Sequence, residues 1–179
     1  TPGYHSVVLE DYGIKVELTS TTRVGFHRYT FPASDQNSII IDLSAQLGPG
    51  GTKSGYAKKV SNSKIKGYAV MEKTSRRPKD TKVFFAIHFN KPFETLNAWK
   101  DGELTGKTNK FEGTNGGVYP VFKSKEGEQL LMKVGISYVS MNQAELNLTT
   151  ELEHWDFDAV VSDSKKQWND HLSRIEIKG

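Results

Sequence analysis

The feature that most constrains the fold is a two-residue alternation of apolar and polar side chains in the first 140 residues. Ile14, Val16 and Leu18 alternate with lysine, glutamate and threonine in residues 14–20. Because successive side chains of a strand point to opposite faces, this spacing predicts a strand with one buried face. Residues 81–89 carry apolar side chains on both faces, which is typical of a central strand.

Segments of this kind recur along the chain, and turn-forming sequences separate them. Many short strands with little helix between them predict a mainly β protein, built as an antiparallel sandwich. The glycine-rich stretch 48–54 (GPGGTKS) lacks the glycine–lysine pair of a phosphate-binding loop, and no helical pattern follows it, so we interpret it as a hairpin loop. The expected strands are residues 6–10, 14–20, 22–31, 38–43, 64–73, 81–89, 94–100, 117–123 and 129–140.

The pattern changes after residue 140. Residues 141–155 are interpreted as a short helix or turn, and a C-terminal helix is predicted over about residues 158–175, with Asp156 or Asp158 as its N-cap. The apolar stripe of this helix needs a surface to rest on. The apolar residues that recur at near-helical spacing are Phe157, Val160, Val161, Trp168, Leu172 and Ile175.

Composition excludes several classes of function. The 24 basic and 21 acidic residues give a net charge of +3, which is too even for a nucleic-acid-binding surface. The chain has no cysteine, so disulfides, thiolate metal sites and cysteine nucleophiles are excluded. No apolar run approaches the roughly 20 residues of a membrane span, so we expect no membrane span, and we expect no nucleic-acid partner.

The titratable residues do not form a recognisable catalytic or metal site. The five histidines never fall at metal-binding spacings, so no metal ligands and no bound cofactor are predicted for this chain alone. A glycosidase needs two carboxylates on opposite sides of a cleft, roughly 5–9.5 Å apart. The clustered carboxylates are instead attributed to the helix dipole, and no catalytic residue is predicted. They are Glu151, Glu153, Asp156 and Asp158.

Two features remain as candidates for a binding surface. In residues 21–32 (TTRVGFHRYTFP), a strand would place Arg23, His27 and Tyr29 on one face. That face is either solvent-exposed or meets a polar partner. Trp99 ends a predicted strand beside a long polar loop, where it either packs under the loop or offers a platform for stacking a sugar.

Several strings together resemble a known family. They are PGY, DYGI, ELT, RxGxHRYxFP and GISYVS, within residues 1–32 and 130–148. These segments resemble the N-terminal β-sandwich domain of bacterial glycoside hydrolase family 92, and residues 154–175 resemble the helical connection to its second domain. The characterised members are calcium-dependent, inverting exo-α-mannosidases. The resemblance implies a galactose mutarotase-like β-supersandwich with a C-terminal linker helix.

The resemblance also implies a division of labour within a longer enzyme. Residues 1–150 correspond to the sandwich, lacking its first strands, and residues 151–179 to a helical linker toward an (α/α)₆ catalytic domain. That domain carries the general acid, the general base and the calcium ligands, so the chain is expected to be a fragment without activity of its own. The implied partners are that domain and mannose-containing glycans, and the implied location is periplasmic or extracellular.

Three functions follow as hypotheses. The first is an accessory domain that docks on the catalytic barrel of an α-mannosidase through the row Arg23, His27 and Tyr29. The second is an autonomous carbohydrate-binding module, and the third is a sandwich with no ligand. A free module would not need an apolar helix at its end, which favours the first.

Overall fold

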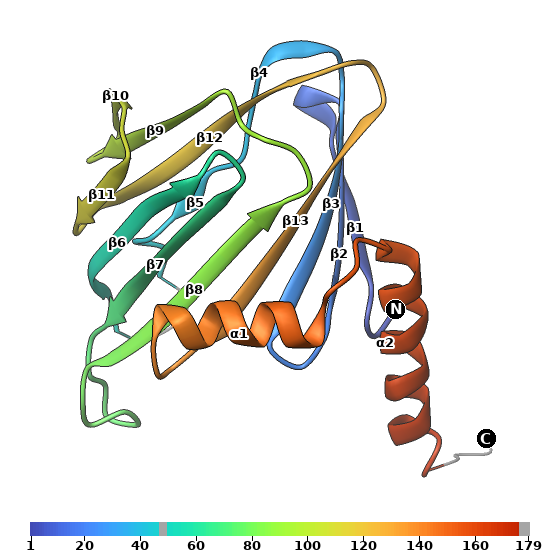
Figure 1. Ribbon diagram of the computed structural model, residues 1–179. Coiled ribbons are helices and arrows are strands. Elements are labelled where there is room, and N and C mark those ends of the chain that lie inside the picture. The colour runs from blue at the N-terminus through green and yellow to red at the C-terminus, as the bar shows by residue number, and fades with distance from the viewer. Residues whose placement is uncertain (47–49, 176–179) are drawn as a thin grey trace.

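Two antiparallel sheets and two helices make up the computed structural model, which describes residues 1–46 and 50–175 (Figure 1). A short 3₁₀ turn, Glu10–Tyr12, joins the first two strands. The strands are β1 (His5–Leu9), β2 (Ile14–Ser20), β3 (Val24–Phe31), β4 (Ser34–Ser38), β5 (Ile41–Asp42), β6 (Thr52–Ser61), β7 (Lys64–Met71), β8 (Thr81–Phe89), β9 (Thr95–Lys100), β10 (Glu103–Lys107), β11 (Lys110–Gly113), β12 (Gly116–Ser124) and β13 (Glu128–Ser137). The helices are α1 (Met141–Glu151) and α2 (Phe157–Leu172).

The larger sheet has the strand order β1-β2-β3-β13-β8-β7-β6-β11, and the smaller sheet has the order β10-β9-β12-β4, with β5 also pairing with β12. The main core lies between them and includes Phe31, Ile87 and Phe122. These findings confirm the predicted mainly β, antiparallel supersandwich. β8 is central as predicted, because it pairs with both β7 and β13 and its residues Phe85, Ala86 and Ile87 are buried.

The two helices cover the other face of the larger sheet, here called the outer face (Figure 1). α1 lies across β13 and β8, and α2 lies on β2 and β3. A second core forms there, in which Phe26 packs against Phe157 with ring centroids 5.2 Å apart. α1 comes so close to the sheet that a Cβ on Gly135 would lie 2.4 Å from the carbonyl oxygen of Ala144. Glycine is therefore required at this position.

Both helices begin at side-chain caps. Ser140 accepts a hydrogen bond from the backbone N–H of Gln143, and Asp156 accepts one from Ala159. The C-terminal helix is confirmed, and Asp156 rather than Asp158 is its cap. None of the helices within residues 1–46 and 50–175 has the length and apolarity needed to cross a bilayer.

Three strands were not expected, and one expected strand is divided. β6 begins inside the stretch interpreted as a hairpin loop, of which residues 48 and 49 lie outside the described residues. The side chains of β6 that face the core must be small. A Cβ on Gly55, for example, would lie 2.5 Å from Leu43. β10 is exposed throughout and β11 is short, so neither carries an apolar alternation. The segment 38–43 contains the end of β4 and all of β5, separated by two residues.

Candidate functional site

β3 divides its side chains between the two faces of the larger sheet. Val24 and Phe26 are buried under the helices on the outer face. Tyr29 and Phe31 point to the opposite side, here called the inner face, where Phe31 is part of the core between the sheets and Tyr29 packs against that core. The row that contains His27 and Tyr29 therefore faces the inside of the sandwich.

His27 and Tyr29 form a neutral pair on this inner face. Nδ1 of His27 lies 2.9 Å from the hydroxyl oxygen of Tyr29, and the Tyr29 ring stacks on Phe31 with centroids 6.0 Å apart. Burial lowers the pKa of His27 to about 4 and raises the pKa of Tyr29. Both side chains are therefore uncharged at neutral pH, which suits a partly covered surface better than a solvent-exposed one.

The structure does not bring Arg23 together with this pair. Arg23 precedes β3, and its guanidinium pairs with Glu151 at the end of α1. The same carboxylate accepts hydrogen bonds from the backbone N–H of Arg23 at 2.9 Å and from the hydroxyl of Thr21 at 2.6 Å. Burial opposes ionisation of Glu151, but these hydrogen bonds lower its pKa overall. Arg23 thus fastens the end of α1.

This contact also corrects the explanation given for the clustered carboxylates. Glu151 is the last residue of α1, where the helix dipole disfavours a negative charge, so its ion pair with Arg23 and not the dipole accounts for it. Asp156 caps α2, and Asp158 pairs with Arg28. Glu151, Asp156 and Asp158 therefore each stabilise a helix or its contact with the sheet.

A network around Arg28 is the strongest polar link between α2 and the sheet. The guanidinium of Arg28 donates to both oxygens of Glu17 at 2.9 Å and to Asp158 at 3.0 Å, and it lies 4.3 Å from the centroid of the Phe157 ring. Glu17 is 3% exposed and also accepts from the Tyr4 hydroxyl at 2.7 Å. The hydrogen bonds from Arg28 lower the pKa of Glu17 to about 2. Sequence reasoning missed this role, although an arginine in the same row as Val24 and Phe26 was the available signal.

Lys133 links β13 to the segment between the helices. It is 2% exposed, and its Nζ donates to the carbonyl oxygens of Leu152 at 2.9 Å and Glu153 at 3.4 Å. The ammonium also lies 3.9 Å from the ring centroid of Trp155. Burial lowers the pKa of Lys133 to about 8. This lysine therefore satisfies carbonyls that α1 leaves free at its end.

α1 itself is held by an ionic cluster. Glu145 lies 2.8 Å from Lys66, 3.5 Å from Lys64 and 3.0 Å from Nε2 of His88. These partners come from β7 and β8, so they fix the middle of α1 on the larger sheet. Together with Arg28 and Lys133, they attach α1, the segment after it and the first turn of α2 to the sandwich.

Trp99 lies on the smaller sheet, away from the row on β3. Its neighbour Ala98 points into the core, so Trp99 points to the opposite side of β9. Its ring is half-buried, and its Nε1–H finds no acceptor among the described residues. A Cβ on Gly117 would lie 3.2 Å from that nitrogen, which shows how closely the next strand approaches. Packing accounts for these contacts, while a role in stacking sugar stays a prediction.

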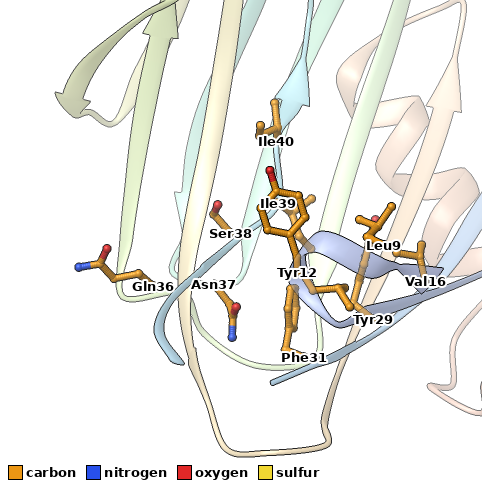
Figure 2. A pocket seen from close by; sticks show the side chains of 11 residues that line it. Leu9, Tyr12, Val16, Tyr29, Phe31, Gln36, Asn37, Ser38, Ile39 and Ile40 are labelled. Carbon is orange, nitrogen blue, oxygen red and sulfur yellow. The ribbon is translucent and has the colours of Figure 1, made fainter. Parts of the chain in front are cut away.

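A cavity of about 560 Å³ opens between the inner face and the edge of the smaller sheet (Figure 2). One wall is formed by β1, β2, β3 and the turn after β1. The other wall is formed by residues 36–40, which comprise the end of β4 and the two residues after it. Every lining side chain is uncharged. The lining residues are Leu9, Tyr12, Ile14, Val16, Tyr29, Phe31, Gln36, Asn37, Ser38, Ile39 and Ile40.

The described residues offer no metal centre. Within residues 1–46 and 50–175, no three histidine, aspartate or glutamate side chains gather in a way that could hold a metal ion. The residues that the structure describes therefore do not fit a calcium site.

Comparison with known proteins identifies the family. Residues 1–137 match the profile of the glycosyl hydrolase family 92 N-terminal domain, and residues 143–179 match that of the glycosyl hydrolase family 92 catalytic domain. A search of curated proteins found no match.

Solved structures agree with the profiles. The family GH92 α-mannosidase BT3965 from Bacteroides thetaiotaomicron has a TM-score of 0.87 at 27% identity, over 99% of this chain and 24% of that chain. Two further structures share the fold. The GH92 inverting mannosidase BT2199 from Bacteroides thetaiotaomicron VPI-5482 has a TM-score of 0.85 at 20% identity, over 100% of this chain and 23% of that one. The GH92 glycosyl hydrolase ccman5 has a TM-score of 0.77 at 23% identity, over 92% and 21%.

The chain thus spans about a quarter of the length of the solved mannosidases. Its first 137 residues match the N-terminal profile, and the helical segment that is fastened to the outer face falls largely within the match to the catalytic-domain profile. The chain belongs to glycosyl hydrolase family 92.

Proposed function

We propose that this chain is the N-terminal accessory part of an α-mannosidase that hydrolyses terminal α-linked mannose with inversion. The observation that carries the proposal is the attachment of residues 143–172, which lie within the match to the catalytic-domain profile, to the outer face of the sandwich. Arg28, Lys133 and Glu145 make that attachment. The resemblance in fold and sequence to the α-mannosidase from Bacteroides thetaiotaomicron supports the same conclusion.

In this proposal the sandwich acts by positioning. Buried polar groups hold α1 and α2 in one orientation, because breaking any of these pairs would leave an uncompensated buried group. The direction in which α2 leaves the sheet then sets where the remainder of the catalytic domain lies. Trp168 and Leu172 near the end of α2 are about half-exposed, and we assign them to the contact with that remainder.

The chemistry is assigned to the remainder of the enzyme. The described residues provide no metal-binding cluster, and Glu151, Asp156 and Asp158 are engaged with the helices, so we assign the catalytic acid and base and the calcium ligands to the rest of the enzyme. We further propose that the enzyme works in the periplasm or outside the cell and acts on mannose-containing glycans.

Mannose release tests this proposal. The natural longer protein and the 179-residue chain are each incubated with a panel of α-linked mannobioses, with calcium and with a chelator. We expect calcium-dependent release of mannose by the longer protein and none by the chain alone. Release by the purified 179 residues would show that the catalytic groups lie within them, and a longer protein inactive on the whole panel would refute the assignment as a mannosidase.

The second candidate is an autonomous carbohydrate-binding module, and the half-buried Trp99 with its unpaired Nε1–H is the observation that keeps it in view. Titration calorimetry of the 179-residue chain with mannose and with mannobioses separates the two functions. Measurable binding that is lost in Trp99→Ala would favour the module.

A further inference from the structure

The two helices leave one end of the outer face of the larger sheet uncovered. α1 lies over β13 and β8 and α2 over β2 and β3, whereas β6 and β11 form the opposite end of the sheet (Figure 1). Ala57 on β6 and Phe111 on β11 belong to the main core, so their neighbours along each strand point to the outer face. These neighbours are Tyr56, Lys58, Lys110 and Glu112.

Three lysines lie directly opposite one another on this uncovered end. The register pairs Lys110 with Lys58, and Lys58 with Lys66 on β7. Like charges in such positions destabilise a sheet. Lys66 is compensated by Glu145, at 2.8 Å, but Lys58 and Lys110 are exposed and neither forms an ion pair within the part of the chain that the structure describes. The sheet therefore carries two adjacent positive charges that its own stability does not require.

A row of aromatic side chains runs beside the lysines on the same face. Tyr56 on β6 pairs with Tyr68 on β7, and their rings stack with centroids 5.3 Å apart and an angle of 20° between the planes. Among the described residues, Tyr56 contacts no second ring, and its partner on β11 is the exposed Glu112. Glu112 has no ion-pair partner within residues 1–46 and 50–175. Tyr56 and Glu112 thus lie next to each other at the end of this row.

These groups provide three different kinds of contact in two adjacent rows. The ring of Tyr56 offers an apolar surface, the ammonium groups of Lys58 and Lys110 donate hydrogen bonds to an anion, and the carboxylate of Glu112 only accepts them. Glu112 would repel a ligand that is anionic throughout, and a neutral sugar would leave two lysines without a counter-charge. A sugar that carries a carboxylate matches all three kinds of contact.

We propose that the outer face of β6 and β11 binds a carboxylate-bearing sugar. The carboxylate lies between Lys58 and Lys110, the sugar ring packs against Tyr56, and hydroxyl groups donate to Glu112. Uronic acid chains and glycans that end in sialic acid share this chemistry. The inference is independent of the proposed mannosidase function, because that function uses none of these four residues.

Titration calorimetry of the 179-residue chain tests the site and identifies the source of the sugar. The probes are tetragalacturonate and sialyllactose, with mannotetraose and lactose as their neutral counterparts. We expect at least one acidic sugar to bind, and its neutral counterpart to bind about tenfold more weakly or not at all, because the charge-assisted contacts to the lysines are lost. Absence of binding by both acidic sugars would overturn the proposal, as would equal affinity for the neutral ones.

Substitutions locate the binding. We expect the double variant Lys58→Gln, Lys110→Gln to lose about tenfold in affinity for the acidic sugar. The charge-matched control is Lys107→Gln, Lys123→Gln, at exposed positions of the smaller sheet, and it should retain the affinity within about twofold. Equal losses in the two double variants would overturn the proposal. Glu112→Gln should weaken binding, and tighter binding would overturn the proposal by showing a plain anion site.

The natural longer protein provides the last test. It should bind the same acidic sugar, and the double variant Lys58→Gln, Lys110→Gln should reduce that binding without changing the release of mannose. If the longer protein does not bind while the chain does, another part of the enzyme covers this face and the proposal is overturned. A longer protein that binds the acidic sugar at these lysines but releases no mannose would refute the proposed function and leave this site standing.

Discussion

The outer and inner faces of the larger sheet bury their polar groups in different ways. On the outer face, Arg28 and Lys133 keep their charges. Arg28 donates to Asp158 on α2, and Lys133 donates to a carbonyl oxygen in the segment between the helices. On the inner face, His27 and Tyr29 are neutral and bond to each other. The outer face therefore joins two pieces of chain in one fixed geometry, whereas the inner face behaves as a core that extends beyond its cover.

The largest expected effect comes from breaking the network on the outer face. In Arg28→Met, the carboxylate of Glu17 stays buried without its main partner, and we expect a loss of about 3–5 kcal/mol in the free energy of unfolding. Urea unfolding of the 179-residue chain measures this loss. In the matched control Lys166→Met, an exposed ion pair with Asp170 is removed, and about 0.5 kcal/mol or less should be lost. Equal losses in the two variants would show that α2 is held by apolar packing alone.

His27 on the inner face and Glu17 on the outer face should lose their contributions to stability in different pH ranges. The folded-state pKa of His27 is about 4, below its ordinary 6.5, so the unfolded chain binds the proton more readily and stability falls as the pH drops from 6.5 toward 4. The folded-state pKa of Glu17 is about 2, below its ordinary 4.5, so its contribution is present above pH 4.5 and is lost between 4.5 and 2. His88, which contacts Glu145 on the outer face, also has a lowered pKa, so only the loss below pH 4.5 is specific to one face.

Urea unfolding as a function of pH measures this difference. We expect the contribution of His27 to be about 1–2 kcal/mol after allowance for its partial contact with solvent. His27→Gln should remove this part of the loss between pH 6.5 and 4, and should leave the loss below pH 4.5 unchanged. His88 also has a lowered pKa and titrates in the same direction, so His88→Gln is the control. A pH profile of His27→Gln that matches the unchanged sequence would show that the pair is accessible to protons.

A smaller effect is expected where α2 begins. Asp156→Ala removes the side chain that accepts from the N–H of Ala159, and should lower the free energy of unfolding by about 1 kcal/mol. Asp163→Ala, at an exposed position on the same helix, serves as its control and should cost less than 0.5 kcal/mol. If both variants unfold alike, the first turn of α2 is fixed by Arg28 and Phe157, without help from the cap.

The sequence was sufficient for the features that depend on local pattern. Alternation predicted β2 and β8 with their observed bounds, and helical spacing predicted α2 to within three residues at its end. β10, β11 and the first four residues of β4 were missed because their positions are largely polar or exposed, and β6 because glycine and lysine obscure its alternation. For such strands, pairing with neighbours decides the conformation, and pairing cannot be read from one segment.

Less of the candidate site could be predicted. Alternation correctly placed His27 and Tyr29 in one row, but it assigned Arg23 to that row, because the bounds of β3 could not be fixed from the pattern. The contacts of Arg28 and Lys133 join residues 11 to 130 positions apart along the chain. The pattern of a single segment cannot predict contacts between residues that lie so far apart in the sequence. The sequence indicates these contacts only by placing a charged residue among apolar residues on the same face of a strand.

The smallest effect is expected outside both faces, at Trp99. Its Nε1–H has no acceptor among the described residues, so Trp99→Phe removes a buried unpaired donor as well as part of a ring. The lost apolar contact and the removed polar group oppose each other, and the free energy of unfolding should change by less than about 1 kcal/mol. Urea unfolding checks this value, and Phe111→Leu on the core side of the neighbouring sheet gives a reference for the loss of ring packing alone. A loss in Trp99→Phe as large as in Phe111→Leu would show that the packing of the indole outweighs the removal of its unpaired donor, and calorimetric titration of Trp99→Phe with mannobioses tests separately whether this ring binds sugar.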